Sequence, residues 1–287
     1  MMSARTITFA TCLGWPELSA SDACLAEALR GRGHHVVAAP WNGPFAPFRD
    51  TVVVIRSSWD YHTAPEAYHA WLSRLDPRRT FNRPDLIRWN LSKAHVLDLL
   101  RRGVCGPRTV QARATASDIA MALQALGIEH GVIKPLFGAS GFGVERVTRG
   151  DEEAALARAQ TGKTMDHVLV QEFVEGVDRG ELAGVFFDGA FSHGLRRVPA
   201  AGEFRINARY GGRMEAATLG PDVIQEMRRI LSLLPASALY ARVDGVRQGS
   251  RFVLMEVEVN EPGLGLNLAP GSADRFADAL LRSLDAG

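Results

Sequence analysis

The residues best suited to binding a charged ligand include a lysine that precedes a glycine-rich loop. Lys134 ends an apolar run, and Gly138, Gly141 and Gly143 follow it closely. Glycines let backbone amides approach a phosphate. The loop joins two expected strands, whereas P-loops and dinucleotide-binding turns run from a strand into a helix. A phosphate would therefore depend on the ammonium of Lys134, and a flexible hairpin loop explains the glycines equally well.

A second pattern of this kind lies between Ala157 and Thr164. It ends in Gly162-Lys163-Thr164, as a relaxed P-loop would. The segment follows an expected helix instead of a strand, which is the wrong context for a P-loop. We therefore interpret Gly162 as the C-cap of that helix.

Oxygen ligands gather on two expected strands near the C-terminal end. In a strand, alternate residues share one face, which places Glu256, Glu258 and Asn260 together. Asp244 on the neighbouring strand adds a fourth oxygen ligand. Clustered carboxylates repel one another unless a cation or solvent relieves them, and Mg²⁺ prefers such oxygen ligands. The pattern favours a metal site over a solvated amphipathic strand.

Two further segments carry chemistry only weakly. Arg205 and Asn207 project together from an extended segment, where Arg205 could bind phosphate or carboxylate or form a surface ion pair. The apolar strand that ends at Gln171 to Val174 offers backbone groups to an adenine edge. Neither segment identifies a function by itself.

Composition limits the classes of protein to consider. The chain has 287 residues, 33 Lys and Arg against 32 Asp and Glu, and 46% hydrophobic residues, as in a globular protein. A net charge of +1 gives no indication of nucleic-acid binding. Three scattered cysteines suit a reducing compartment. We find no signal peptide and no membrane-spanning run, so we expect a cytoplasmic protein without membrane partners.

The elements that must position these residues fall into three groups. Strands and helices alternate in the first third, which predicts a small parallel sheet. A compact α+β unit follows, and then a mostly β portion with two helices. The expected strands are 7–12, 35–39, 51–56, 108–110, 132–134, 144–147, 167–172, 182–187, 191–198, 239–244 and 251–260; the expected helices are 21–30, 65–75, 92–102, 115–126, 151–161, 221–234 and 272–284.

The order of these motifs resembles the ATP-grasp ligases. Lys134-Pro135 with its glycine loop and Phe204-Arg-Ile-Asn207 before Gly211-Gly212 are similar to bacterial glutathione synthetases and ribosomal-protein glutamyl ligases. Arg56-Ser-Ser-Trp-Asp-Tyr61 and Glu256-x-Glu258 resemble more narrowly the small cycloserine-forming ligases of antibiotic pathways. The resemblance implies an α/β and α+β ATP-grasp fold with an N-terminal Rossmann-like (pre-ATP-grasp) parallel sheet. We place its domains at 1–88, 89–175 (with a linking helix at 89–106) and 176–287.

The resemblance also implies a role for each motif residue. Catalytic roles fall to Lys134, Arg205 and Arg242, and the metal ligands come from Asp244, Glu256, Glu258 and Asn260, with Glu256 and Glu258 competing for one position. For the nucleotide, the implied residues are Lys93, Lys134, Gly138, Ser140, Gly141, Gly143, Gln171, Glu172, Phe173, Val174, Asn207 and Glu181 (or, in its place, Asp178). For the acceptor substrate, they are Arg56, Ser57, Trp59, Asp60 and Tyr61.

The implied function is an ATP- and Mg²⁺-dependent ligase, with up to two metal ions and Mn²⁺ as a substitute. It would activate a small amino-acid-like carboxylate as an acyl phosphate and couple it to an amine, between molecules or by ring closure. The resemblance also suggests a homodimer. The alternative is a non-catalytic ATP-binding regulatory or carrier protein. NAD-dependent oxidoreduction is disfavoured, because Cys12-Leu-Gly14-Trp15-Pro16 lacks a three-glycine turn.

Overall fold

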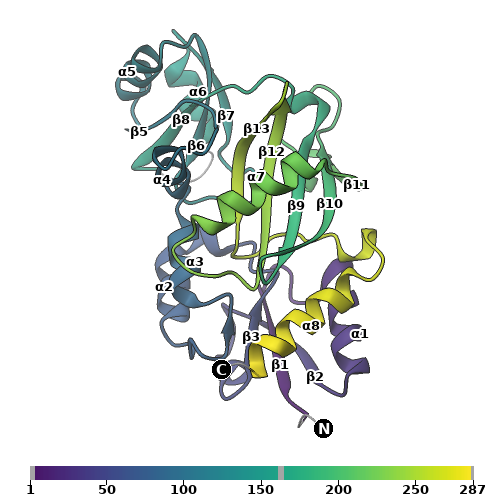
Figure 1. Cartoon of the computed structure of the whole chain (residues 1–287). Coiled ribbons are helices and arrows are strands. Elements are labelled where there is room, and N and C mark those ends of the chain that lie inside the picture. Colours follow the sequence, from purple (N-terminus) through teal and green to yellow (C-terminus); the bar gives the residue numbers. More distant parts are fainter. Residues whose placement is uncertain (1–3, 161–164, 286–287) are drawn as a thin grey trace.

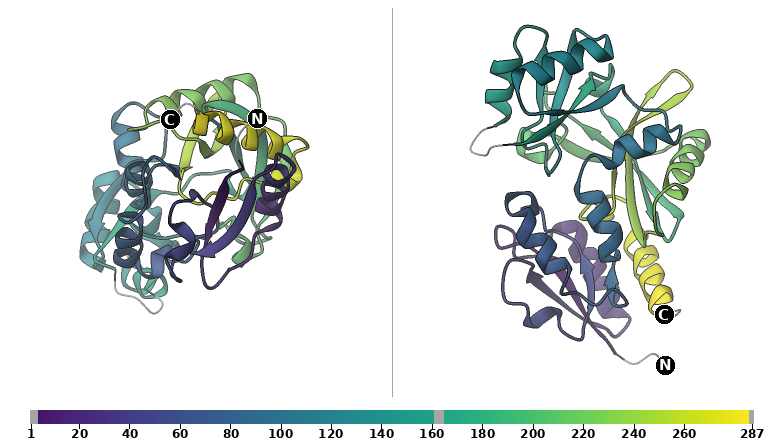
Figure 2. Two further views of the ribbon diagram at one scale, coloured as in Figure 1. Left: turned by 90° about the horizontal axis from the view of Figure 1, so that it is seen from below. Right: turned by 90° about the vertical axis from the view of Figure 1, so that its left-hand side faces the viewer.

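The computed structural model describes residues 4–160 and 165–285. The three expected groups of elements form three sheets (Figures 1 and 2). The proposed helix cap at Gly162 lies outside the described residues.

The first sheet is parallel, with strand order β2-β1-β3-β4. Its strand β3 is a continuous run of buried aliphatic residues, as expected for a strand covered on both faces. Helix α1 begins after Ser19, whose side chain accepts a hydrogen bond from the amide of Asp22. The prediction of an N-terminal Rossmann-like sheet is confirmed. The elements are β1 (Thr6–Thr11), α1 (Ala20–Gly31), β2 (His35–Pro40), β3 (Val52–Ile55), α2 (Pro65–Leu72) and β4 (Thr80–Phe81).

The central unit is a four-stranded antiparallel sheet of order β5-β8-β6-β7, with helices α5 and α6 packed on it. Helices α3 and α4 lead into it from the first sheet (Figure 1). Its elements are α3 (Pro84–Leu91), α4 (His95–Arg101), β5 (Thr109–Arg113), α5 (Ala116–Leu126), β6 (His130–Pro135), β7 (Glu145–Thr148), α6 (Glu152–Ala159) and β8 (His167–Glu172).

The third sheet is antiparallel, with order β11-β10-β9-β12-β13, and α7 lies across one of its faces (Figure 1). Strands β12 and β13 pair so that Asp244 lies opposite Glu256 and Arg242 opposite Glu258. Among the described residues, no helix is long and apolar enough to cross a bilayer. The elements are β9 (Glu181–Phe187), β10 (Ala190–Val198), β11 (Arg213–Ala217), α7 (Pro221–Ser232), β12 (Tyr240–Gln248), β13 (Arg251–Glu258) and α8 (Ser272–Asp285).

Helix α8 joins the first and third sheets. It packs on α1 and also on β9 and β10, and Figure 1 shows it beside α1. One hydrophobic core therefore contains Ile7 and Leu25 of the first unit together with Val185, Phe276 and Leu280. The domain limits of 1–88, 89–175 and 176–287 remain a prediction. This hydrophobic core contains residues of the first and of the third predicted domain.

Three of these α-helices and strands were not expected from the sequence. Strand β4 has only two residues, which gives no periodic pattern. Strand β11 is mostly exposed and is held at the sheet edge by its pairing with β10. Helix α3 begins at Pro84 with an acidic residue in its first turn.

One expected strand is shorter than predicted. The strand expected at 251–260 ends at Glu258.

Candidate active site

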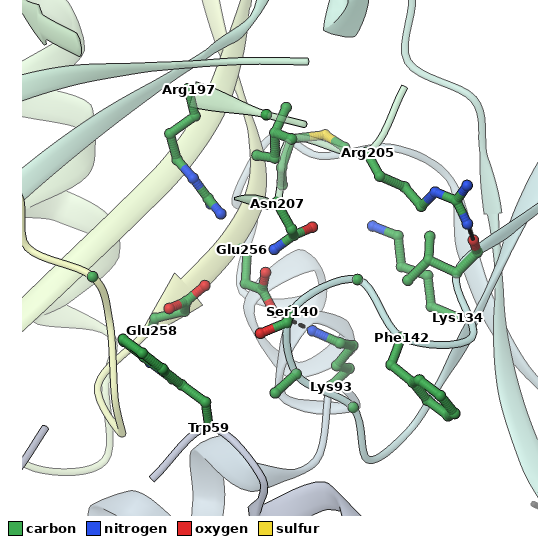
Figure 3. A pocket seen from close by; sticks show the side chains of 18 of the residues that line it. Trp59, Lys93, Lys134, Ser140, Phe142, Arg197, Arg205, Asn207, Glu256 and Glu258 are labelled. Carbon is green, nitrogen blue, oxygen red and sulfur yellow. Dashed lines mark hydrogen bonds and ion pairs between the residues drawn. The ribbon is translucent and has the colours of Figure 1, made fainter. Parts of the chain in front are cut away.

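A cavity of about 860 Å³ lies where the three sheets approach one another. It collects side chains from all three units (Figure 3). Eighteen of the residues expected at the site line it: Trp59, Asp60, Tyr61, Lys93, Lys134, Gly138, Ser140, Gly141, Gln171, Glu172, Phe173, Val174, Glu181, Arg205, Asn207, Arg242, Glu256 and Glu258.

Two lysines supply positive charge to one side of this cavity. Lys93 follows α3 and forms an ion pair with Glu256. Lys134 lies on β6, and burial together with the nearby Lys93 lowers its pKa from the ordinary value, although Glu256 opposes the shift. The ammonium of Lys134 makes no hydrogen bond or ion pair with any described residue. Lys134 is therefore a cation that remains available for an anionic ligand.

The glycine-rich loop covers this part of the cavity and touches two other units. The Tyr210 hydroxyl donates to the carbonyl of Gly141 at 3.2 Å, and the Tyr61 hydroxyl lies 3.5 Å from the carbonyl of Gly138. Gly141 has φ +72°, and a Cβ there would lie 2.6 Å from Oδ1 of Asn207. Only glycine fits so closely in this conformation. The loop is therefore packed in place as a cover and does not hang free.

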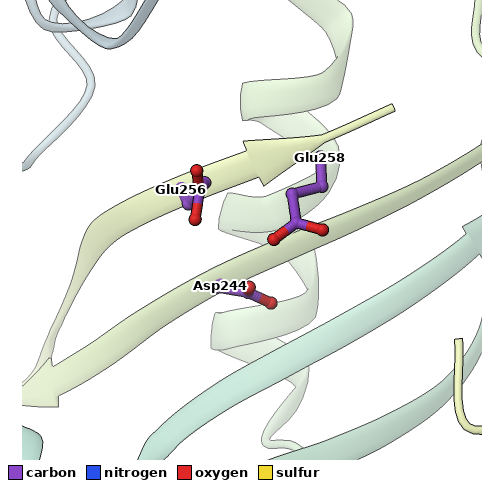
Figure 4. Close-up of side chains that lie close together, drawn as sticks. All are labelled: Asp244, Glu256 and Glu258. Carbon is purple, nitrogen blue, oxygen red and sulfur yellow. The ribbon is translucent and has the colours of Figure 1, made fainter. Parts of the chain in front are cut away.

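Three carboxylates form the candidate metal centre. Asp244, Glu256 and Glu258 each offer an oxygen, and these oxygens lie within 4.8 Å of one another (Figure 4). Mg²⁺ holds oxygen ligands at about 2.0–2.1 Å, so opposite ligands lie about 4.1 Å apart. A small inward movement would bring all three to such an ion. The donors are hard oxygens, which fits Mg²⁺ or Mn²⁺.

Arginines neutralise the same carboxylates. Arg242 donates through Nε to Asp244 at 2.9 Å, and Arg197 of β10 also pairs with Asp244. Arg242 further pairs with Glu258. Asp244 is fully buried, which is tolerated because two guanidinium groups surround it. Arg197 lines the cavity and was not predicted from the sequence.

Burial raises the pKa values of the acidic groups in the cavity, whereas neighbouring cations lower them. Burial would raise the pKa of Glu256, but Lys93 and Lys134 outweigh it and lower that pKa to about 2. Burial raises the pKa of Glu258 against the effect of Arg242. Burial also raises the pKa of Glu181 to about 7 and that of Glu261 to about 8. Shifts of this size gather at functional sites.

Arg205 is held on the cavity wall by its own partners. Its guanidinium donates to Glu203 at 2.7 Å and to Glu145 at 3.0 Å, and it lies 3.8 Å above the ring of Tyr210. The side chain nevertheless lines the cavity together with Asn207 (Figure 3). Arg205 therefore forms ion pairs and also lies at the cavity, so both interpretations made from the sequence apply to it.

The opposite end of the cavity is lined by aromatic residues from the first unit. Trp59 contacts Trp15 edge to face, with ring centroids 5.4 Å apart. Asp60 accepts hydrogen bonds from the side chains of Trp41 at 2.6 Å and Asn42 at 2.9 Å. These contacts fix the wall on which Tyr61 also lies.

The placement of Arg56 and Ser57 does not fit the expected role in substrate binding. Both are buried and neither lines the cavity. Arg56 pairs with Asp22 at 2.8 Å and donates to the carbonyl of Pro262 at 2.7 Å, and Ser57 donates to Asp22 at 3.0 Å. A buried charge needs such a partner, and Asp22 supplies it. Arg56 is a structural residue here.

Asn260 does not lie on the strand as expected. Because β13 ends at Glu258, the alternation of side chains does not continue to residue 260. Asn260 is buried and accepts a hydrogen bond from the Tyr68 hydroxyl at 2.9 Å, so its part in metal binding stays a prediction. Gly143 does not line the cavity either, although its neighbours do. Glu261, which does line it, was not predicted.

Two family models match the chain. One, described as the N-terminal domain of D-cycloserine synthetase DcsG, matches residues 7–82. The other, the ATP-grasp domain of prokaryotic glutathione synthetase, matches residues 107–263. The second match covers the residues that form the glycine loop and the carboxylate cluster.

Relatives align over most of the chain. The cycloserine biosynthesis protein DcsG of Streptomyces lavendulae is 31% identical over 283 residues, which cover 91% of this chain and 92% of that protein. A glutathione synthetase of Parasynechococcus marenigrum is 29% identical over 83% of this chain and 80% of that protein.

Solved structures show the same architecture. The crystal structure of D-cycloserine synthetase DcsG superimposes with a TM-score of 0.84 at 25% identity, covering 97% of this chain and 99% of that one. A D-alanine–D-alanine ligase from Bacillus anthracis superimposes with a TM-score of 0.67 at 14% identity, covering 99% and 98% of the two chains, which indicates a common fold.

Proposed function

The chain belongs to the ATP-grasp ligases and is an ATP-dependent carboxylate–amine ligase, and from this premise we propose how its cavity carries out the reaction. The observation that supports the proposal most strongly is that Lys134 and the carboxylates Glu256 and Glu258 line one cavity. A cation that can bind a triphosphate and oxygen ligands that can bind a divalent ion therefore lie in the same cavity. The alternative of a non-catalytic nucleotide-binding protein has no support among the relatives.

We assign the phosphate-binding role to the basic residues of the cavity. Phosphoryl transfer requires positioning and charge neutralisation more than covalent help from the protein. Lys134 is free to bind phosphate oxygens, and Arg205 lies on the same wall. Lys93 and Arg197 each neutralise one of the metal-site carboxylates. They would turn to phosphate once a divalent ion neutralises those carboxylates.

Asp244, Glu256 and Glu258 would hold Mg²⁺, one ion or two, with Mn²⁺ as a substitute. Such an ion stabilises charge on the transferring phosphoryl group. The carboxylate substrate attacks the γ-phosphorus of ATP, the bond from that phosphorus to the bridging oxygen breaks, and ADP leaves. The amine then attacks the acyl carbon and expels inorganic phosphate. The packed glycine loop excludes water that would hydrolyse the acyl phosphate.

We propose a small amino-acid-like substrate, because the polar side chain of Asp60 lines the cavity beside the aromatic side chains of Trp59 and Tyr61. Ring closure within one molecule is the favoured outcome, since the relative from Streptomyces lavendulae that aligns over 91% of this chain is a cycloserine biosynthesis protein. A role in antibiotic biosynthesis follows from the same likeness. A cytoplasmic location and a homodimer remain predictions from the sequence.

The test measures ADP release with a panel of small amino acids and amine nucleophiles, with and without Mg²⁺. We expect release that depends on both substrate and metal. Lys134→Met removes the free cation and Asp244→Asn removes a metal ligand, and each should lower turnover roughly 100-fold or more. The exposed Glu129→Gln serves as the matched control. Turnover retained in both site variants would refute the assigned site, and mass spectrometry of the product distinguishes cyclisation from joining.

A further inference from the structure

The segment that follows β13 is held by an unusual set of contacts. Four consecutive carbonyl oxygens, of residues 261 to 264, each accept a hydrogen bond from a side chain. In order, the donors are Trp59 at 3.1 Å, Arg56 at 2.7 Å, Arg242 at 2.9 Å and His193 at 2.8 Å. Side chains from several elements thus fix this backbone, as the outer support of a binding site requires.

Glu261 belongs to this fixed segment. Its backbone carbonyl is held by Trp59, but its side-chain carboxylate has no such partner. The residue is only 9% exposed and lines the cavity. Apart from its own backbone amide, its side chain has no hydrogen-bond donor or counter-ion among the described residues. Burial without a partner disfavours the charged carboxylate, and a ligand that supplies a positive charge would favour it.

The surroundings of Glu261 favour a cation as that ligand. Burial and the nearby carboxylates Glu258 and Glu256 raise its pKa to about 8, while Lys93 offsets them only in part. The other two carboxylates have their own cationic partners, Arg242 and Lys93. Of these three carboxylates, Glu261 is therefore the one without a cationic partner among the described residues.

The cavity wall on this side is aromatic. Trp59 holds the carbonyl of Glu261 with its indole N–H and contacts Trp15 edge to face, and both tryptophans line the cavity. In Figure 3, Trp59 lies on the side of Glu258 and away from Lys134. Aromatic faces attract organic cations. The cavity thus has an anion-binding side at Lys134 and a side that suits an ammonium group.

We propose that Glu261 binds the ammonium group of an amino-acid-like substrate, beside an aromatic wall formed by Trp15 and Trp59. A primary ammonium brings three hydrogen-bond donors and a positive charge, which are the two things the Glu261 carboxylate lacks. Glu261 is then a specificity-determining residue that selects zwitterionic substrates over simple acids. The inference rests on the proposed ligase function only for its biological meaning, because the binding itself can be measured without turnover.

The experiment uses the full chain labelled with ¹⁵N and follows the indole N–H resonance of Trp59, which Trp59→Phe identifies. Ethylammonium chloride is the probe, with sodium chloride at equal ionic strength and ethanol as controls. We expect a saturable shift with ethylammonium alone. In Glu261→Gln the affinity should fall at least tenfold, whereas Glu129→Gln should match the unaltered protein. No saturable shift in the unaltered protein, or equal affinity in Glu261→Gln, would overturn the proposal.

A second probe keeps the test decisive if Glu261→Gln does not fold. Tetramethylammonium is attracted to aromatic rings but cannot donate a hydrogen bond, so we expect the unaltered protein to bind it at least tenfold more weakly than ethylammonium. Equal affinities would assign the cation to Trp15 and Trp59 alone and refute the role of Glu261. Titration of ATP and Mg²⁺ into the same samples reports on the nucleotide site separately, so failure of the ligase assignment is seen independently.

Discussion

Replacing Gly141 by alanine tests whether the glycine loop must pack as closely as the structure shows. The new Cβ would lie 2.6 Å from Oδ1 of Asn207 and 3.1 Å from Cε2 of Tyr210. The backbone at this position has φ +72°, which alanine adopts only with strain. Two costs therefore act together, one from the backbone and one from the collision.

Gly150 separates these two costs. It also has a positive φ, of +93°, but a Cβ there would meet nothing within 4 Å. Gly150→Ala thus carries backbone strain of roughly 1–2 kcal/mol without a collision. Gly141→Ala adds overpacking, which typically costs about 1–3 kcal/mol. If that extra cost falls on the closed loop, kcat/KM drops about 5- to 150-fold further, since 1.36 kcal/mol is a factor of ten.

The assay compares both variants with the unaltered protein by ADP release, using the amino acid and amine that give the highest rate. Thermal unfolding of each variant measures the strain that they share. We expect Gly150→Ala to lower the melting temperature by the shared strain, Gly141→Ala to lower it by no less, and kcat/KM to fall strongly in Gly141→Ala alone. Equal kcat/KM in the two variants would show that close packing of the loop against Asn207 is not needed for turnover.

Two further predictions concern buried charges. Arg56→Met leaves Asp22 buried without its partner, so we expect the free energy of unfolding to fall by about 3–5 kcal/mol in urea titrations. The control Arg32→Met breaks only partly exposed ion pairs and should lower it by under about 1 kcal/mol. Equal losses in the two variants would contradict the structural role of Arg56. For Glu181, whose pKa is raised to about 7, ionisation opposes folding, so stability falls as the pH rises from about 4.5 to 7. Glu181→Gln should therefore become more stable relative to the unaltered protein by roughly 3 kcal/mol over that interval, and a pH-independent difference would contradict it.

Much of the fold could be predicted because the decisive patterns are local. The aliphatic run at Val52–Ile55 and the helical spacing after Ser19 each indicate one element without help from the rest of the chain. Strand β11, at Arg213–Ala217, could not be predicted in this way. Its residues are mostly exposed, and only the pairing with β10 makes the segment a strand.

Part of the site could also be predicted from local patterns in the sequence. Glu256 and Glu258 stand out because charged residues at alternate positions of a strand must share a face. Arg197 could have been found by the same reasoning, since it continues the inward positions of His193 and Leu195 in β10. Adjacent Arg196 hid this signal, because a pair of arginines suggests a solvent-exposed surface.

The role of Arg56 could not be predicted from local sequence. Its partner Asp22 looks like an ordinary acidic residue in the first turn of α1, and only the folded chain brings the two together. Glu261 was missed because, apart from its own backbone amide, its carboxylate has no hydrogen-bond donor among the described residues. That absence is a property of the whole cavity.

Helix α8 has a consequence for how the protein is made. Its residues cover α1, and Arg32 of the first unit reaches Asp278 across 246 positions of sequence. Domains commonly fold in order as they leave the ribosome. Here the earliest-made sheet must wait, with α1 uncovered, until almost the whole polypeptide has been synthesised. A ribosome-bound nascent chain lacking α8 should therefore expose that surface to chaperones.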